Sequence, residues 1–101
     1  MKYKWHGFAE VAPFEVNAEV LEGASGAFVN VIALARDIDE VQDLTQNWLG
    51  QFGLNLITLS NVKLITSKAY QKGGLPDEML QLANQVSETC PVQFSTFDAF
   101  P

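Results

Sequence analysis

The most continuous apolar stretch of the chain runs from residue 27 to residue 35, where nearly every position is apolar. A strand of this kind is covered on both faces, so the pattern predicts a central strand of a sheet. Residues 54–60 predict a second strand. The segment between them predicts a helix, because its apolar residues recur at spacings of three and four. These residues are Val41, Leu44, Trp48, Leu49 and Phe52.

The ends of this helix carry residues that favour helix termini. Asp37 is the predicted N-cap, and Glu40 follows three residues later in an acidic variant of the capping box. Gly50 and Gly53 supply the stop, and Gly53 is the better candidate for a left-handed residue after the last turn. Strands joined by a crossover helix run in the same direction, so we expect the two flanking strands to lie side by side and parallel.

The N-terminal part of the chain predicts two further strands. Residues 2–11 and 14–21 alternate apolar and polar side chains, which is typical of strands with one face in water. The pair Ala12-Pro13 separates them. Residues 22–26 are expected to form the loop of an antiparallel hairpin that leads into the central strand.

The C-terminal part predicts one helix and one strand. Residues 61–66 either continue the preceding strand past a bulge or turn back as a short antiparallel partner. A helix begins at Pro76 and ends at Pro91, residues 92–97 form a strand, and residues 98–101 are a frayed tail. The apolar stripe of the helix consists of Leu75, Met79, Leu82, Ala83 and Val86.

The order of these elements predicts an α+β fold in one domain that covers residues 1–101. A chain of 101 residues suffices for a single hydrophobic core. We expect a two-layer α/β sandwich, ferredoxin-like or a variant of it. It would have a mixed sheet, two helices on one face, and an extra N-terminal strand.

Charge and composition restrict the partners and the compartment. The formal net charge of −6 argues against nucleic acid and anionic membranes, because both require clustered lysine and arginine. A macromolecular partner is therefore expected to be neutral or basic. We expect a cytoplasmic protein, since the sequence has no apolar run that could span a bilayer, no signal peptide and a single cysteine.

Few residues of this chain could carry chemistry. His6 is the only histidine and Cys90 the only cysteine, so a metal site or a nucleophile pair would have to combine these two with carboxylates. The sequence contains no glycine motif that binds phosphate. We predict no catalytic residue, no metal and no cofactor. An enzyme that uses His6 or Cys90 with a carboxylate stays as an alternative.

Aromatic residues are concentrated near the two ends of the chain, in greater number than one core of this size requires. Surplus aromatic side chains favour an interface, because monomers rarely expose a large apolar surface. We therefore expect a non-enzymatic accessory or interaction domain of bacterial type, which forms a homo-oligomer and can bind a protein partner. The predicted interface residues are Trp5, Phe8, Phe14 and Phe97.

Residues 33–37 and 51–60 resemble the first half of ACT domains, which are ferredoxin-like modules that bind amino acids at subunit interfaces. The likeness lies in Asp37 at the end of a strand, a helix of similar length, and residues 52–57 entering the next strand. Where that family has a glycine shortly after the aspartate, this chain has residues 38–41, Ile-Asp-Glu-Val. The resemblance implies a small-ligand sensor with Asp37, Ile38 and Asp39 near the pocket.

Overall fold

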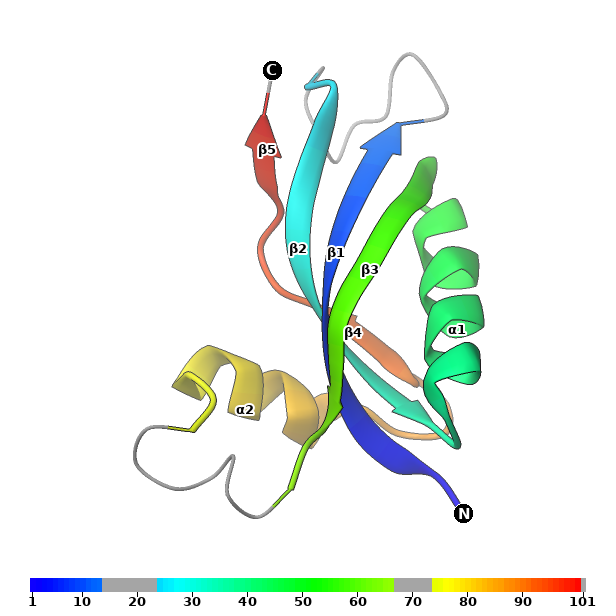
Figure 1. Ribbon diagram of the computed structural model, residues 1–101, viewed down its shortest axis with the longest axis vertical. Helices are drawn as coiled ribbons and strands as arrows, with labels where there is room; N and C mark the ends of the chain where they lie inside the picture. The colour runs from blue at the N-terminus through cyan, green and yellow to red at the C-terminus, as the bar shows by residue number, and fades with distance from the viewer. Residues whose placement is uncertain (14–23, 67–73, 101) are drawn as a thin grey trace.

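The computed structural model describes residues 1–13, 24–66 and 74–100. Five strands form one sheet in the order β3-β1-β2-β4, and β5 also pairs with β2 (Figure 1). Two helices pack on this sheet, so the α+β class is confirmed. The elements are β1 (Tyr3–Pro13), β2 (Gly26–Ala35), α1 (Ile38–Gly50), β3 (Leu54–Leu64), α2 (Asp77–Gln85), β4 (Val92–Phe94) and β5 (Asp98–Phe100).

The central position predicted for the apolar segment 27–35 is confirmed. This segment is β2, which pairs with β1 on one side and with β4 and β5 on the other. Alternate residues of a strand point to the same face, and the odd-numbered residues of β2 point toward α1. They form the main core with Val41 and Leu49 of α1. These buried residues of β2 are Ala27, Val29, Val31, Ala33 and Ala35.

The expected adjacent parallel pair is wrong. β1 lies between β2 and β3 and is antiparallel to both, so β2 and β3 run in the same direction without being neighbours. Every strand pair of the described residues is antiparallel, and the expected mixed sheet is therefore wrong too. The physical reason is that β1 supplies the fully buried Ala9 and Val11, which complete the surface beneath α1.

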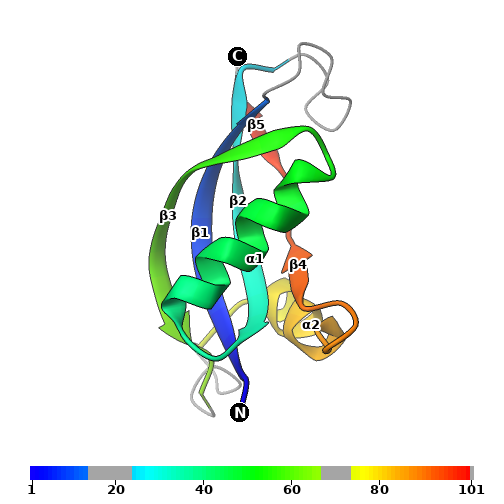
Figure 2. The ribbon, with the colours of Figure 1, turned by 90° about the vertical axis from the view of Figure 1, so that its right-hand side faces the viewer.

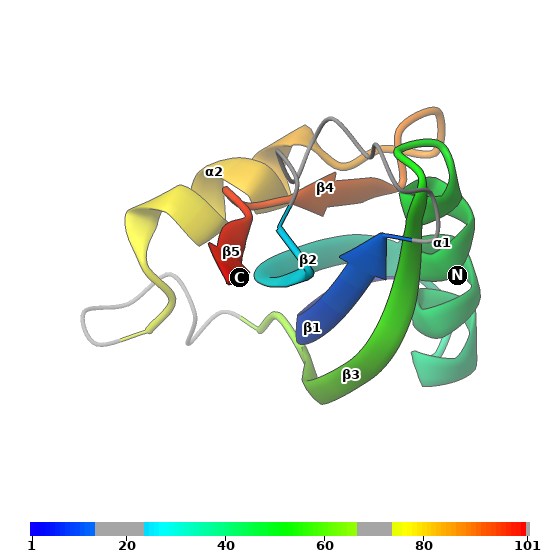
Figure 3. The same cartoon turned by 90° about the horizontal axis from the view of Figure 1, so that it is seen from above.

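The two helices pack on opposite faces of the sheet, which corrects the expectation that they share one. Ile32 and Leu34, at even positions of β2, form a separate cluster with Ala83 and Val86 of the second helix segment. Neighbouring residues of a strand point to opposite faces, so α2 lies across the sheet from α1 (Figures 2 and 3). α1 and the sheet make a two-layer sandwich, and α2 covers part of the other face. The cause is that β2 is apolar on both faces.

The element ends match the sequence closely around α1 and β3. Asp37 is the N-cap, and Gly53 has a φ of 74°, as predicted for the residue that reverses the chain. β3 continues to Leu64, and its pairing with β1 shifts register beside Asn61, whose φ is 54°. The first of the two alternatives for this segment, a strand continued past a bulge, is confirmed. The predicted strand 14–21 lies outside the described residues.

Three predicted breaks in the chain are wrong. β1 runs through Ala12 to Pro13, which a strand tolerates because Pro13 is its last residue. α2 ends at Gln85, since Val86 is extended and the next residues form a turn before Pro91. The predicted strand 92–97 stops at Phe94 in β4. The expected tail instead forms β5 beside residues 26–28 of β2.

The contact between Gly26 and Phe100 gives a test of the attachment of β5. A Cβ atom at Gly26 would lie 2.5 Å from the Phe100 ring and 2.9 Å from the backbone oxygen of Val11. We expect Gly26→Ala to lower the free energy of unfolding by about 1–3 kcal/mol, because the backbone oxygen cannot move aside. Urea denaturation followed by circular dichroism measures this change.

Gly50 provides the matched control, since a Cβ atom there would meet no atom within 4 Å. Gly50→Ala is expected to raise the free energy of unfolding by up to about 1 kcal/mol, because alanine favours the helix. Equal effects of the two substitutions would contradict the close approach of Phe100 to Gly26.

Candidate interaction site

Three phenylalanines from three strands lie together on the sheet face opposite α1, and we call them the aromatic row. The Phe8 and Phe28 rings are stacked, with centroids 5.5 Å apart and planes 19° apart. The Phe28 and Phe100 centroids are 5.1 Å apart. Phe28 is 38% exposed although it belongs to the central strand. No helix or strand of the described residues covers this part of the face, since α2 packs near Ile32 instead.

Polar side chains border the aromatic row. His6 Nε2 and Asn30 Oδ1 lie 3.0 Å apart, and the Asn30 N–H donates to Ser95 Oγ at 2.9 Å. These bonds join β1 and β2 to the segment that follows β4. His6 is therefore part of a contact that links the strands, and it lies on the same face as Phe8 because their positions differ by two.

A second aromatic group lies on the α1 side of the sheet, where the end of α1 meets β4. It surrounds a cleft of about 290 Å³, which we call the aromatic cleft. The Phe52 and Phe94 rings meet edge to face with centroids 6.5 Å apart, and Phe94 and Phe97 are 6.0 Å apart. Phe52 is 44% exposed. None of the lining residues is charged: they are Trp48, Phe52, Cys90, Val92, Gln93, Phe94, Ser95 and Phe97.

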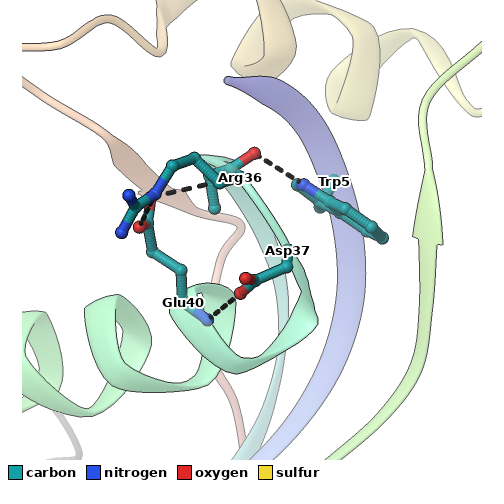
Figure 4. A network of polar contacts seen from close by, with 5 residues as sticks. Trp5, Arg36, Asp37 and Glu40 are labelled. Atoms are coloured by element: carbon teal, nitrogen blue, oxygen red, sulfur yellow. Dashed lines mark hydrogen bonds and ion pairs between the residues drawn. The ribbon is translucent and has the colours of Figure 1, made fainter. Parts of the chain in front are cut away.

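The structure places the predicted interface residues in different surroundings. Trp5 packs against the core beneath α1, and its Nε1 donates to the Ala35 carbonyl at 2.9 Å (Figure 4). Phe8 belongs to the aromatic row and Phe97 to the aromatic cleft. Phe14 lies outside the described residues. A role of these four side chains in an interface stays a prediction.

Sequence reasoning missed two members of the aromatic row. Phe28 was assigned to a strand covered on both faces, and Phe100 to a frayed tail. The sequence of residues 27–35 did contain a sign that Phe28 is exposed. Asn30 points to the same face of the strand as Phe28, and a polar residue there indicates that this end of the face is in contact with water. No local signal identified Phe100, since its partner Gly26 is distant in sequence.

Asp37, Ile38 and Asp39, the residues implied as ligand-binding by the ACT resemblance, lie at the start of α1. Asp37 Oδ1 accepts the Glu40 N–H at 2.8 Å, so its carboxylate caps the helix (Figure 4). Ile38 is 49% exposed and Asp39 is exposed. Neither the aromatic cleft nor the groove between α1 and β3 is lined by any of the three. Their role in binding a ligand stays a prediction.

Glu40 forms an ion pair with Arg36 beside this cap. Arg36 Nε donates to Glu40 Oε2 at 2.8 Å, and the Arg36 N–H donates to Glu40 Oε1 at 3.2 Å. The hydrogen bond from Arg36 lowers the pKa of the Glu40 carboxyl, and the same bond raises the pKa of Arg36. In an ordinary capping box the glutamate accepts the N–H of the N-cap residue, whereas here it accepts that of the preceding residue.

His6 and Cys90, the residues of the enzyme alternative, are held by separate contacts. Cys90 Sγ accepts a hydrogen bond from Gln93 Nε2 at 3.2 Å, whereas His6 contacts Asn30. No hydrogen bond joins His6 to Cys90 in the described ranges. Within those same residues, no group of three or more histidine, cysteine, aspartate or glutamate side chains is placed to hold a metal ion.

Comparison of the chain with models of protein families, with curated proteins and with solved structures gave no match. Among residues 1–13, 24–66 and 74–100, no helix is both long and apolar enough to cross a membrane.

The cap at Asp37 gives a second test of the structure. We expect Asp37→Ala to lower the free energy of unfolding by about 1 kcal/mol, because the Glu40 N–H loses its acceptor. Asp37→Asn is the control, since asparagine also caps helices. Urea denaturation compares the three proteins. A cost of Asp37→Asn as large as that of Asp37→Ala would contradict the capping role.

Glu40 gives a prediction on pH. Its pKa is lowered in the folded protein, so the ion pair stabilises the fold at neutral pH and this contribution disappears as the pH falls through the lowered pKa. Thermal melts of wild type and Glu40→Gln should therefore differ slightly at neutral pH and converge in acid. The difference should also shrink in high salt, since the pair is at the surface. A gap that widens in acid would contradict this account.

Proposed function

We propose that this protein is a non-enzymatic interaction domain that associates with a second copy of itself through the aromatic row. The observation that carries the proposal is the exposed Phe28 ring, which lies between Phe8 and Phe100 on a part of the sheet face that no described helix covers. We also propose a cytoplasmic location, which the absence of a disulfide partner for Cys90 supports.

Burial of the aromatic row would supply the main attraction. Removal of apolar surface from water is favourable by about 25 cal/mol per Å², and a phenylalanine in contact with another ring gains further from stacking. The three rings already contact one another, so few side-chain rotamers would be lost on binding. The row is therefore organised for contact in the free monomer.

A second copy is the partner that fits the shape of this face. Two sheets pack face to face when their twists agree, and identical faces have the same twist and the same alternation of side chains. Contacts of this kind are isologous, which is the commonest symmetry of homodimers. Polar residues that are hydrogen-bonded to one another border the row, as polar residues do at the rim of an interface. They are His6, Asn30 and Ser95.

The surroundings of His6 and Cys90 support a non-enzymatic role. A nucleophile and its base are held within hydrogen-bond reach of each other, and here each of the two contacts an amide side chain instead. The arrangement of β2, α1 and β3 around β1 also supports a variant of the ferredoxin-like fold, a class of domain that hosts many binding functions.

Sedimentation equilibrium across micromolar concentrations tests the proposal. We expect the wild-type chain to form a dimer and Phe28→Ser to raise the dissociation constant at least about thirtyfold, as loss of a central aromatic costs about 2 kcal/mol or more. Circular dichroism must show that the variant remains folded. A wild-type chain that stays monomeric throughout would overturn the proposal.

Two matched substitutions identify the surface involved. Ile38→Ser removes an apolar side chain of 49% exposure away from the row and should leave the dimer intact. Ile57→Ser removes one of 52% exposure on the edge strand β3 and should also leave it intact. If Ile57→Ser dissociated the dimer and Phe28→Ser did not, the contact would lie at the β3 edge. The aromatic row would then not be the interface.

A further inference from the structure

Four aromatic rings line the aromatic cleft without filling it. Trp48 belongs to α1, Phe52 to the turn after it, Phe94 to β4, and Phe97 to the segment before β5. Aromatic rings in contact have centroids about 4.5–7 Å apart. The two ring pairs here, at 6.5 and 6.0 Å, lie in the upper half of that range, and a space of about 290 Å³ stays between the walls.

The walls are placed so that one cation can contact more than one ring. A cation is attracted to an aromatic face when it lies within about 6 Å of the ring centroid. The Phe52 and Phe94 planes meet at 84° and their centroids are 6.5 Å apart, so a group in the corner between them can lie within that distance of both. Trp48 belongs to the same lining, and indole attracts cations more strongly than the rings of tyrosine and phenylalanine. The cleft therefore has the arrangement of an aromatic cage.

Charge around the cleft also favours a cation. The lining contains no lysine or arginine that would repel one. The whole chain has a net charge of −6, and the potential of an acidic protein raises the concentration of cations at its surface. An anion would be repelled by this potential and would meet no cationic side chain in the lining.

The polar side chains of the lining indicate which kind of cation fits. A primary ammonium group has three N–H donors, and each needs an acceptor when water is removed. The Ser95 hydroxyl already accepts the Asn30 N–H at 2.9 Å, and Cys90 Sγ accepts from Gln93 Nε2 at 3.2 Å. A quaternary ammonium group has no N–H, so it enters among the rings at a lower cost. The volume of about 290 Å³ is sufficient, since an apolar cavity of about 150 Å³ holds benzene.

We infer that the aromatic cleft binds a small molecule that carries a trimethylammonium group. The cationic head would lie in the corner between Phe52 and Phe94, with Trp48 and Phe97 beside it. The rest of the molecule would lie toward solvent on the side of Phe52, which is 44% exposed.

This site is separate from the aromatic row. The cleft lies on the α1 face of the sheet, whereas the row lies on the opposite face. Each copy of a dimer formed through the row would keep its own cleft, so binding of the cation does not depend on self-association.

Choline and neohexyl alcohol, in which carbon replaces the nitrogen of choline, are the probes for the test. The two molecules have the same shape, so their comparison isolates the charge. Each is titrated into the full chain, and the two tryptophan indole N–H signals are followed by NMR. We expect choline to shift the Trp48 signal and to leave that of Trp5, which is bonded to the Ala35 carbonyl, in place. Choline should bind at least about fivefold more tightly than the alcohol, which corresponds to about 1 kcal/mol.

Protein variants locate the site. Phe52→Leu keeps an apolar side chain but removes one aromatic face, so it should weaken choline about threefold or more and change the affinity for neohexyl alcohol less. Phe28→Ser, on the opposite face, is the control and should leave the affinity for choline unchanged. Choline binding by this variant is measured without the dimer, so either proposal can fail alone.

Three results would overturn the cation site. One is equal affinity for choline and neohexyl alcohol, and another is no shift of the Trp48 signal with choline. The third is a peptide with trimethylated lysine that binds at least about tenfold more tightly than choline, because the ligand would then be a protein side chain and not a free small molecule.

Discussion

The structure depends on β2 being apolar on both of its faces. Its odd-numbered residues are packed beneath α1, and Ile32 on the other face packs against Ala83 and Val86. Both faces of such a strand must be covered by other elements, because the free-energy cost of apolar surface in water is proportional to the exposed area. β1, both helices and the C-terminal strands all take their places from this one requirement. Replacing Ile32 by a polar residue would expose the second helix as well as the strand.

The part of β2 that is not covered twice creates the surface for the proposed function. α2 reaches the even-numbered face only near Ile32, and toward Gly26 that face is left to Phe28. Phe8 and Phe100 pack against Phe28 and reduce its contact with water without enclosing it. The exposed row is thus a consequence of a short α2 on a longer sheet. On the other face, Trp48 in the last turn of α1 and Phe52 just after it form the cleft with β4 and the residues beside it.

Individual residues show which features a local pattern can predict. Asp37 and Gly53 determine conformation within a few residues of themselves, so the ends of α1 could be predicted from their side chains alone. The neighbour of β2 could not, because β1 and β3 compete for that place with similar alternating patterns. The aromatic row was predicted only through Phe8. Phe100 lies in a three-residue strand whose only anchors are its pairing partner Gly26 and the Phe28 ring.

The sequence by itself determined the α+β class, the central strand, the capped helix, and the scarcity of residues suited to catalysis. These follow from composition, from periods of two and of about 3.6 residues, and from side chains that act on adjacent backbone. Only the tertiary structure decided that β1 separates β2 from β3, that α2 covers the face opposite α1, and that Phe28 stays exposed. Those outcomes depend on contacts between residues far apart in the chain. The pattern of β2 is apolar on both faces, so it does not determine which helix covers which face.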